Sequence, residues 1–230
     1  MTSTTESDRR LPTTGLIACL GIAALMAALS IWAYPSMVPE IVTREANGRH
    51  GENSPGRAFT AAALPITLVG VGVLMALAAK LNPRFLERFP RGAHPNYRNS
   101  VRVLNVVLTL VAILLLVMHV GLLALYLDRQ FPLESAMVTA VGVVLIGLGV
   151  VLPLTRPEGR FTNSTAERAR AASAKTYRAA GYWLALCGFA VIVLAWISSQ
   201  AAMVVGVGGL VLAFAAIIVT GLRAALRPPA

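Results

Sequence analysis

Six stretches of this chain contain no aspartate, glutamate, lysine or arginine, and they limit the possible folds more than any other feature. Each is about 20 residues long, the length of helix that crosses a hydrocarbon core of roughly 30 Å. Six such helices would leave a soluble domain without a polar face. The chain is therefore predicted to be an all-α integral membrane bundle of six transmembrane helices. The stretches are Thr14–Tyr34, Phe59–Ala79, Val103–Leu127, Ser135–Leu154, Ala179–Ile197 and Ala202–Leu222.

The composition of the chain agrees with this class. Hydrophobic residues make up 57% of the 230 residues and charged residues only 13%. The mean hydropathy is +0.71. A soluble protein needs considerably more polar surface than this. Both cysteines, Cys19 and Cys187, fall inside apolar stretches, where we expect them to act as small packing residues.

The placement of positive charge predicts the orientation in the membrane. Sixteen of the twenty lysines and arginines lie in the two tails and in the second and fourth connections, and only four lie in the other three connections. The positive-inside rule places the basic segments, and so both termini, in the cytoplasm. We therefore expect a bacterial cytoplasmic (inner) membrane protein whose partners include anionic lipids. No segment has the pattern of a nucleic-acid-binding domain.

The chain divides into five parts on this topology. A polar tail (1–13) precedes a four-span part (14–154) that contains an extracytoplasmic loop (35–58). A basic cytoplasmic loop (155–178) leads to a two-span hairpin (179–222) and a short tail (223–230). Alanine-rich sequence from Thr165 onward predicts a short basic helix that runs into the fifth span and either lies on anionic lipid or is a solvated connector.

The sequence contains no motif that predicts catalysis. No metal-binding, nucleotide-binding or nucleophile motif occurs, and the six stretches hold no carboxylate. Ion-coupled transporters usually place an ionisable residue inside the bundle, so this absence also counts against active transport. We expect a protein that is not an enzyme and that binds no cofactor and no metal.

The third span carries a polar stripe. At 100° per residue, Asn105, Thr109, His119 and Tyr126 fall within about 60° of one line, and Arg102 lies at its edge. The stripe should face the protein interior, because these groups would be costly in lipid. It forms either a polar pocket or relay, or hydrogen bonds between helices. We favour the second interpretation because the stripe has no acidic partner.

The loop 35–58 supplies a second set of candidate residues. Glu40, Arg44, Glu45 and His50 could together bind a ligand or a metal ion. Their spacing fits no standard metal site, and solvated loop residues are the simpler explanation.

The order of motifs along the chain resembles that of SdpI-family membrane proteins, together with the domain of unknown function at their start. The similarity runs from about residue 30 to 200. It rests on a Tyr-Pro pair at the end of the first span, a Pro-Glu loop, a proline in the second span, an Asn-Tyr-Arg approach to the third, and basic motifs around the fifth. These are Tyr34-Pro35-Ser36-Met37, Pro39-Glu40-Ile41-Val42-Thr43, Pro65, Asn96-Tyr97-Arg98, His119, Leu152-Pro153, Thr155-Arg156 and Lys175-Thr176-Tyr177-Arg178 before Gly181.

Two positions depart from the family pattern. Arg44 stands where the family usually has histidine, with His50 nearby. The family motif Gly-Ile-Arg-Thr-Pro-Trp has its nearest match in Gly159-Arg160-Phe161-Thr162, so Arg156 and Arg160 are the candidate residues there.

The resemblance implies a non-enzymatic protein of immunity or signalling type. Its best-understood members protect the cell against a secreted killing factor and signal its presence by capturing a repressor at the membrane. The partners so implied are an extracellular peptide toxin and a cytoplasmic regulator. Two alternatives from other classes are a small-solute transporter or permease, and a structural membrane subunit that needs a partner chain.

Overall fold

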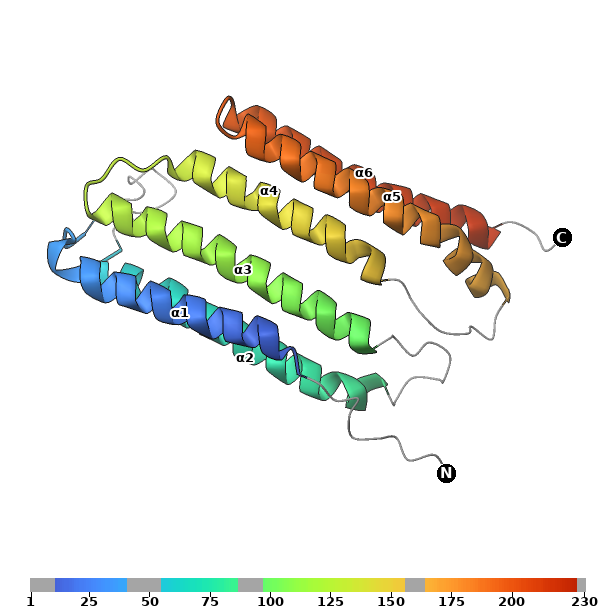
Figure 1. Cartoon of the computed structure of the whole chain (residues 1–230), viewed down its shortest axis with the longest axis horizontal. Coiled ribbons are helices and arrows are strands. Elements are labelled where there is room, and N and C mark those ends of the chain that lie inside the picture. The colour runs from blue at the N-terminus through green and yellow to red at the C-terminus, as the bar shows by residue number, and fades with distance from the viewer. Residues whose placement is uncertain (1–10, 41–54, 87–96, 156–163, 227–230) are drawn as a thin grey trace, which may run out of the picture.

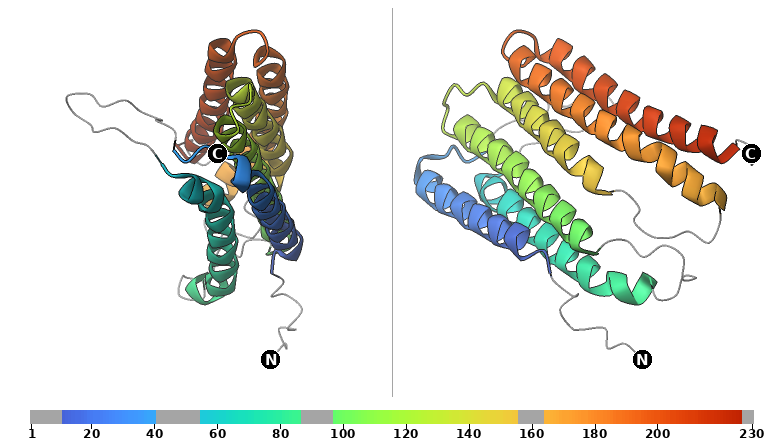
Figure 2. Two further views of the ribbon diagram at one scale, coloured as in Figure 1. Left: turned by 90° about the vertical axis from the view of Figure 1, so that its left-hand side faces the viewer. Right: turned by 45° about the vertical axis from the view of Figure 1, so that its right-hand side comes forward.

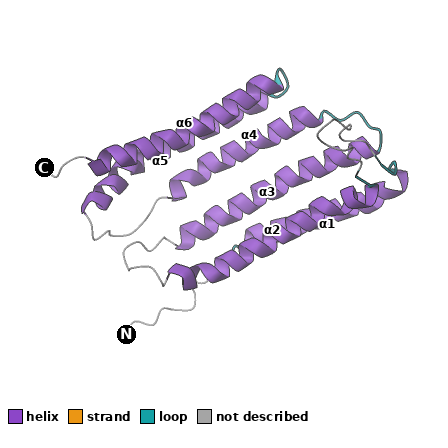
Figure 3. Ribbon diagram, turned by 180° about the vertical axis from the view of Figure 1, so that it is seen from behind, coloured by secondary structure: helices purple, strands orange, loops and turns teal. Residues whose placement is uncertain are grey.

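The computed structural model describes residues 11–40, 55–86, 97–155 and 164–226. Within these ranges the chain is almost entirely helical (Figure 3). The helices are α1 (Thr13–Ala33), α2 (Arg57–Leu86), α3 (Tyr97–Tyr126), α4 (Leu133–Val151), α5 (Ser164–Leu194) and α6 (Ser199–Leu226). Two 3₁₀ turns, η2 (Tyr34–Ser36) and η3 (Leu152–Thr155), extend α1 and α4.

All six helices are long and apolar enough to cross a membrane, which confirms the predicted fold class. The six spans are Thr13–Ser36, Arg57–Leu81, Val101–Tyr126, Leu133–Leu154, Lys175–Leu194 and Ser199–Ala224. They agree with the charge-free stretches to within a few residues. Charged residues flank the spans at every connection except that between α5 and α6, because charge cannot enter the hydrocarbon core without a large cost.

The helices run side by side and alternate in direction, with α1 and α2 along one edge, then α3, then α4, and α5 with α6 along the other edge (Figure 1). The start of α1 and the end of α6 lie at the same end of the bundle, as an even number of spans requires (Figure 1). One apolar core joins α1, α2 and α3 around Met26, Leu68 and Leu108. A second joins α4, α5 and α6 around Leu145, Leu184 and Val191.

The six spans are thus packed as two groups of three. Figure 2 shows both groups from the side and end, with α3 and α4 meeting between them. This grouping does not follow the division of the sequence into a four-span part and a hairpin, because α4 packs mainly on α5. Helix α5 begins at Ser164 and continues into the membrane, so the expected basic helix is its first part.

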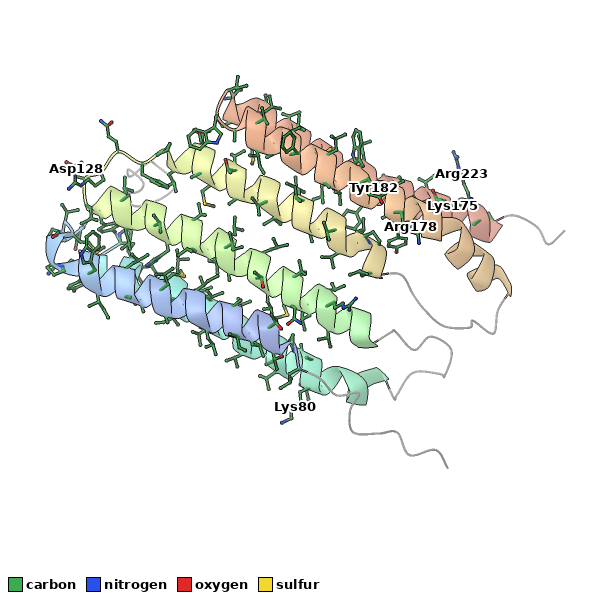
Figure 4. The ribbon with its side chains drawn as sticks, viewed as in Figure 1. Lys80, Asp128, Lys175, Arg178, Tyr182 and Arg223 are labelled. Carbon is green, nitrogen blue, oxygen red and sulfur yellow. The ribbon has the colours of Figure 1, made fainter. Side chains whose placement is uncertain are left out.

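Charged side chains separate to the two ends of the bundle. Asp128 lies at one end and Lys80, Lys175, Arg178 and Arg223 at the other (Figure 4). Among the charged side chains that the structure describes, the second end holds only cations, and Arg102 at the start of the third span belongs to it. We call it the basic end. The opposite end, which holds Tyr126, Glu40, Arg57, Asp128, Arg129 and Glu134, is called the Tyr126 end.

Candidate functional site

The two described ends of the connection between α1 and α2 are held together on Tyr126. The backbone N–H of Val38 donates to the carbonyl of Tyr126 over 3.0 Å, and that of Arg57 donates to the carbonyl of Pro39 over 2.9 Å. The hydroxyl of Tyr126 donates to the carbonyl of Pro55. Tyr126 is only 1% exposed. It is therefore a buried residue to which both ends of the connection are hydrogen-bonded.

Thr60 extends this cluster into α2. Its hydroxyl donates to the hydroxyl oxygen of Tyr126 over 3.1 Å. Tyr126 therefore accepts one hydrogen bond and donates another, which uses the donor and the acceptor capacity of a phenol. A buried tyrosine usually finds such partners, and here they come from two different segments of the chain.

The next residue of α2, Ala61, begins a second cluster. Four residues further on, Pro65 has no backbone N–H, so the carbonyl of Ala61 loses its usual helical donor. The hydroxyl of Ser30 in α1 replaces it and donates to that carbonyl over 2.8 Å. A neighbouring helix that satisfies a carbonyl freed by proline is the usual way for a membrane helix to tolerate proline. Helix α2 accordingly continues through Pro65 without interruption.

His119 completes the second cluster from α3. It is 0% exposed, and its Nε2 lies 3.0 Å from Ser30 Oγ and 3.1 Å from the carbonyl oxygen of Met26. The hydrogen of Ser30 already goes to Ala61 and a carbonyl only accepts, so we assign the ring hydrogen to Nε2. Nδ1 is then a buried acceptor, and it has no hydrogen-bond partner within the described part of the chain.

A polar path therefore runs from the connection into the bundle. It passes from Pro55 through Tyr126 and Thr60, and then from Ala61 through Ser30 to His119. Thr60 and Ala61 are consecutive in α2, so one turn of this helix belongs to both clusters. His119 lies seven residues before Tyr126, which puts it about 10 Å deeper in the span.

An apolar groove of about 460 Å³ lies beside this path, between α1 and α2. Small residues hollow it, and Tyr34 and Pro35 line it at the Tyr126 end. Ser30, which is hydrogen-bonded to His119, also lines the groove. The small lining residues are Ala27, Ala61 and Ala62.

Arg57 lies next to the same end of the groove. Its guanidinium carbon is 4.7 Å from the centre of the Tyr34 ring, a cation–π distance. Its Nη1 donates to the carbonyl of Met37 over 3.4 Å. The first turn of α2 thus places a positive charge at the tyrosine that lines the groove.

The polar stripe of α3 turns inward, but it does not form one pocket. Asn105 Oδ1 accepts a hydrogen bond from the backbone N–H of Gly15 over 2.8 Å, and so caps a free donor in the first turn of α1. Thr109 donates to the carbonyl of Asn105 in its own helix over 2.9 Å. Fourteen residues separate Asn105 from His119, a distance of about 21 Å along a helix. Arg102 is exposed at the basic end.

The loop candidates are only partly within the described residues. Glu40 is exposed, and its backbone forms an isolated antiparallel bridge with Gly56. Arg44, Glu45, His50, Arg156 and Arg160 lie outside the described residues, so their proposed roles remain predictions. Among the residues that the structure describes, no group of three or more histidine, cysteine, aspartate or glutamate side chains is placed to hold a metal ion.

Four residues of this region were missed by the analysis of the sequence: Ser30, Arg57, Thr60 and Ala61. The sequence did contain one usable signal. Pro65 frees the carbonyl of Ala61, and a serine or threonine of a neighbouring span is the expected donor. Which neighbour supplies it depends on helix packing, which the sequence alone does not contain.

Comparisons with known proteins add no assignment to this geometry. No family model matches the chain, and neither a curated protein nor a solved structure matches it. The class defined by the fold is a multi-pass helical membrane protein.

Proposed function

We propose that this chain is a non-enzymatic protein of the bacterial cytoplasmic membrane, of SdpI type, that recognises an extracellular membrane-active peptide. In this proposal both termini and the basic end face the cytoplasm. The Tyr126 end faces outward and presents the connection between α1 and α2 to the peptide. The outcome of recognition is resistance to the peptide, a signal to a cytoplasmic regulator, or both.

One observation carries the proposal: the connection rests on Tyr126, and Tyr126 begins a polar path that reaches His119 in the membrane. A ligand that displaces the connection would break the hydrogen bonds of Tyr126 first. The loss would then affect α2, because Thr60 of this helix bonds Tyr126. The next residue, Ala61, bonds Ser30, which in turn bonds His119. The cations at the basic end offer a surface for an acidic regulator.

The proposal is tested by deleting the gene and challenging the cells with culture supernatant of sibling cells. We expect the deletion strain to grow less well than the parent, and the wild-type gene to restore growth. Equal growth of the two strains in every active supernatant would contradict an immunity function, and an unchanged transcriptional response as well would contradict signalling.

The complementation assay has a matched pair of variants. Tyr126→Phe removes both hydrogen bonds of the hydroxyl and keeps the ring, so we expect it to reach the membrane in normal amount and to protect poorly. Tyr182→Phe makes the same chemical change on α5, at a side chain that is 79% exposed to the surroundings of the bundle (Figure 4). This control should protect as well as the wild type.

A small-solute transporter is the second candidate function, and the buried Nδ1 of His119 favours it. Ionisable residues at this depth often belong to a substrate or proton pathway, and Nδ1 is the ring nitrogen of His119 that has no partner among the described residues. Against it, the groove between α1 and α2 shares no lining residue with a second cavity of about 420 Å³ among α3, α4, α5 and α6. Solute flux into vesicles that contain the purified protein, abolished by His119→Gln, would support transport.

A further inference from the structure

The groove between α1 and α2 lies on the outside of the bundle, within the spans. Ile31 and Ile66, on its two walls, are 76% and 68% exposed, so the groove is open along its side. In a membrane this side faces hydrocarbon. Its lining consists of aliphatic and proline side chains apart from Ser30 and Tyr34. The part of the groove within the span therefore suits an acyl chain and offers little to a polar solute.

The end of the groove has the opposite character. Arg57 is half-buried and rests on Tyr34, and no carboxylate lies within ion-pair distance of it among the described residues. The guanidinium carries five N–H donors, of which one goes to the carbonyl of Met37. Among the described residues the other donors have no acceptor, so we expect them to bind an oxyanion. Arginine binds phosphate oxygens through two parallel hydrogen bonds, which fixes the orientation of the phosphate.

Arg57 lies at the depth in the membrane at which lipid head groups are found. It is the first residue of α2 and of the second membrane span, so it lies where hydrocarbon gives way to the polar interface. Arg57 covers Tyr34, and tyrosine is a residue type that is enriched at the membrane–water interface. An apolar channel beside a cation that has no carboxylate partner within the described part of the chain matches an amphiphile with a hydrocarbon chain and an anionic head.

We propose that this groove is a binding site for one anionic phospholipid, with an acyl chain between α1 and α2 and its phosphate on Arg57. Ser30 lies in the wall against which the chain rests, and it is hydrogen-bonded to His119. A bound lipid therefore stabilises the packing of α1 on α2 near the Tyr126 end. The inference does not depend on peptide recognition, and it holds for a transporter or a structural subunit equally.

The test compares phosphatidylglycerol with phosphatidylcholine of identical chains. The full-length protein is purified in detergent, stripped of lipid, mixed with equal amounts of both lipids and examined by native mass spectrometry. We expect one phosphatidylglycerol to be retained in preference to phosphatidylcholine. Arg57→Gln should reduce this preference about fivefold, the change that corresponds to the roughly 1 kcal/mol contributed by one cation. Arg129→Gln removes a cation from the same end and should leave the preference unchanged, because it is Arg57 that lies on Tyr34 of the groove.

A second pair of variants tests the channel. Ala62→Trp fills the groove and should abolish the retention of phosphatidylglycerol, whereas Ala78→Trp, also exposed on α2 but outside the lining, should not. Phosphatidylglycerol with a photoreactive group in the middle of its chain should label wild-type α1 and α2, which gives a result even if Ala62→Trp fails to fold. Equal retention of the two lipids by the wild type, a preference unchanged in Arg57→Gln, retention by folded Ala62→Trp, or labelling confined to other helices would overturn the proposal.

Discussion

His119 keeps its ring in a span by donating one hydrogen to two acceptors, Ser30 Oγ and the carbonyl of Met26. Neither acceptor depends on it alone, because Ser30 also bonds Ala61 and the Met26 carbonyl belongs to a helix. A side-chain amide supplies the same kind of donor. The contribution of His119 to stability should therefore be modest, although the residue is completely buried.

We expect His119→Gln to lower the free energy of unfolding by no more than about 1 kcal/mol, since hydrogen bonds between membrane helices average roughly 0.6 kcal/mol. Thermal unfolding of the purified variant in detergent measures this. The same variant enters the protection assay in parallel. A large loss of stability would contradict the structural explanation, and a stable variant without protection would identify His119 as part of the functional site.

Ser30 and Pro65 give a second prediction at this scale. Ser30→Ala should cost about 1 kcal/mol, because it leaves the carbonyl of Ala61 without a donor. Pro65→Ala restores a backbone N–H to that carbonyl, so in this background Ser30→Ala should cost less. A double-mutant cycle of unfolding free energies isolates the difference. Strict additivity of the two changes would show that the carbonyl does not link them.

At the scale of elements, α4 and α5 approach each other through glycines. A Cβ placed on Gly149 would lie 2.5 Å from the carbonyl oxygen of Gly181, and one on Gly181 would lie 2.5 Å from that of Gly149. Gly142 and Gly188 form a second such pair one heptad away, at 2.8 Å and 2.6 Å. Two antiparallel helices that touch at two glycine pairs gain close backbone contact, which is the main source of helix association in lipid.

Gly181→Ala should therefore cost about 1–3 kcal/mol, because its methyl group meets rigid backbone and must separate the helices. Gly70→Ala is the matched control: nothing lies within 4 Å of its Cβ position. In a helix this control should be neutral or should gain up to about 1 kcal/mol. Thermal unfolding of both variants measures the contrast, and equal stabilities would show that α4 and α5 do not pack as described.

The spans were predictable from the sequence and their packing was not, for one physical reason. Charged residues flank most spans, and the length of a span divides the charge-free run 179–222 into α5 and α6, so the spans can be found by counting residues. In a soluble protein the apolar face of a helix also identifies its buried side, whereas a membrane helix is apolar on every side. Gly181 could be recognised as a small contact residue, but its partner Gly149 could not. The same limit hid Ser30, whose role depends on which helix lies opposite.

The candidate site divides in the same way. His119, Tyr126 and Asn105 were recognisable because polar residues in a span must face protein, and each of them does bond another segment. That Asn105 caps α1, about 21 Å from His119, follows only from the packing of α1 on α3.

At the scale of the whole molecule, the two groups of three helices meet through α3 and α4. Leu110 packs against Gly147, and Leu133 packs against Gly121. At this interface between α3 and α4, glycines therefore make room for large side chains. The site and the groove belong to the first group, and the second cavity is lined by α4, α5 and α6 together with two valines of α3. A signal that starts at Tyr126 must cross this interface to reach the second group.

The direction of such a signal depends on which end faces outward, and the final prediction concerns this orientation. The cations at the basic end favour the cytoplasm for that end, because the positive-inside rule acts on residues close to the ends of spans.

In a background where Cys19 and Cys187 are replaced by alanine, a membrane-impermeant maleimide added to intact cells should modify Gln130→Cys and His50→Cys. It should modify Pro90→Cys and Thr165→Cys only after lysis. Positions 50 and 130 lie between the first and second and between the third and fourth spans, whereas 90 and 165 lie between the second and third and between the fourth and fifth. The two pairs must therefore behave oppositely in any six-span topology. The reverse result would place the connection on Tyr126 in the cytoplasm, where it could not meet an extracellular peptide, and would refute the proposed function while leaving the fold intact.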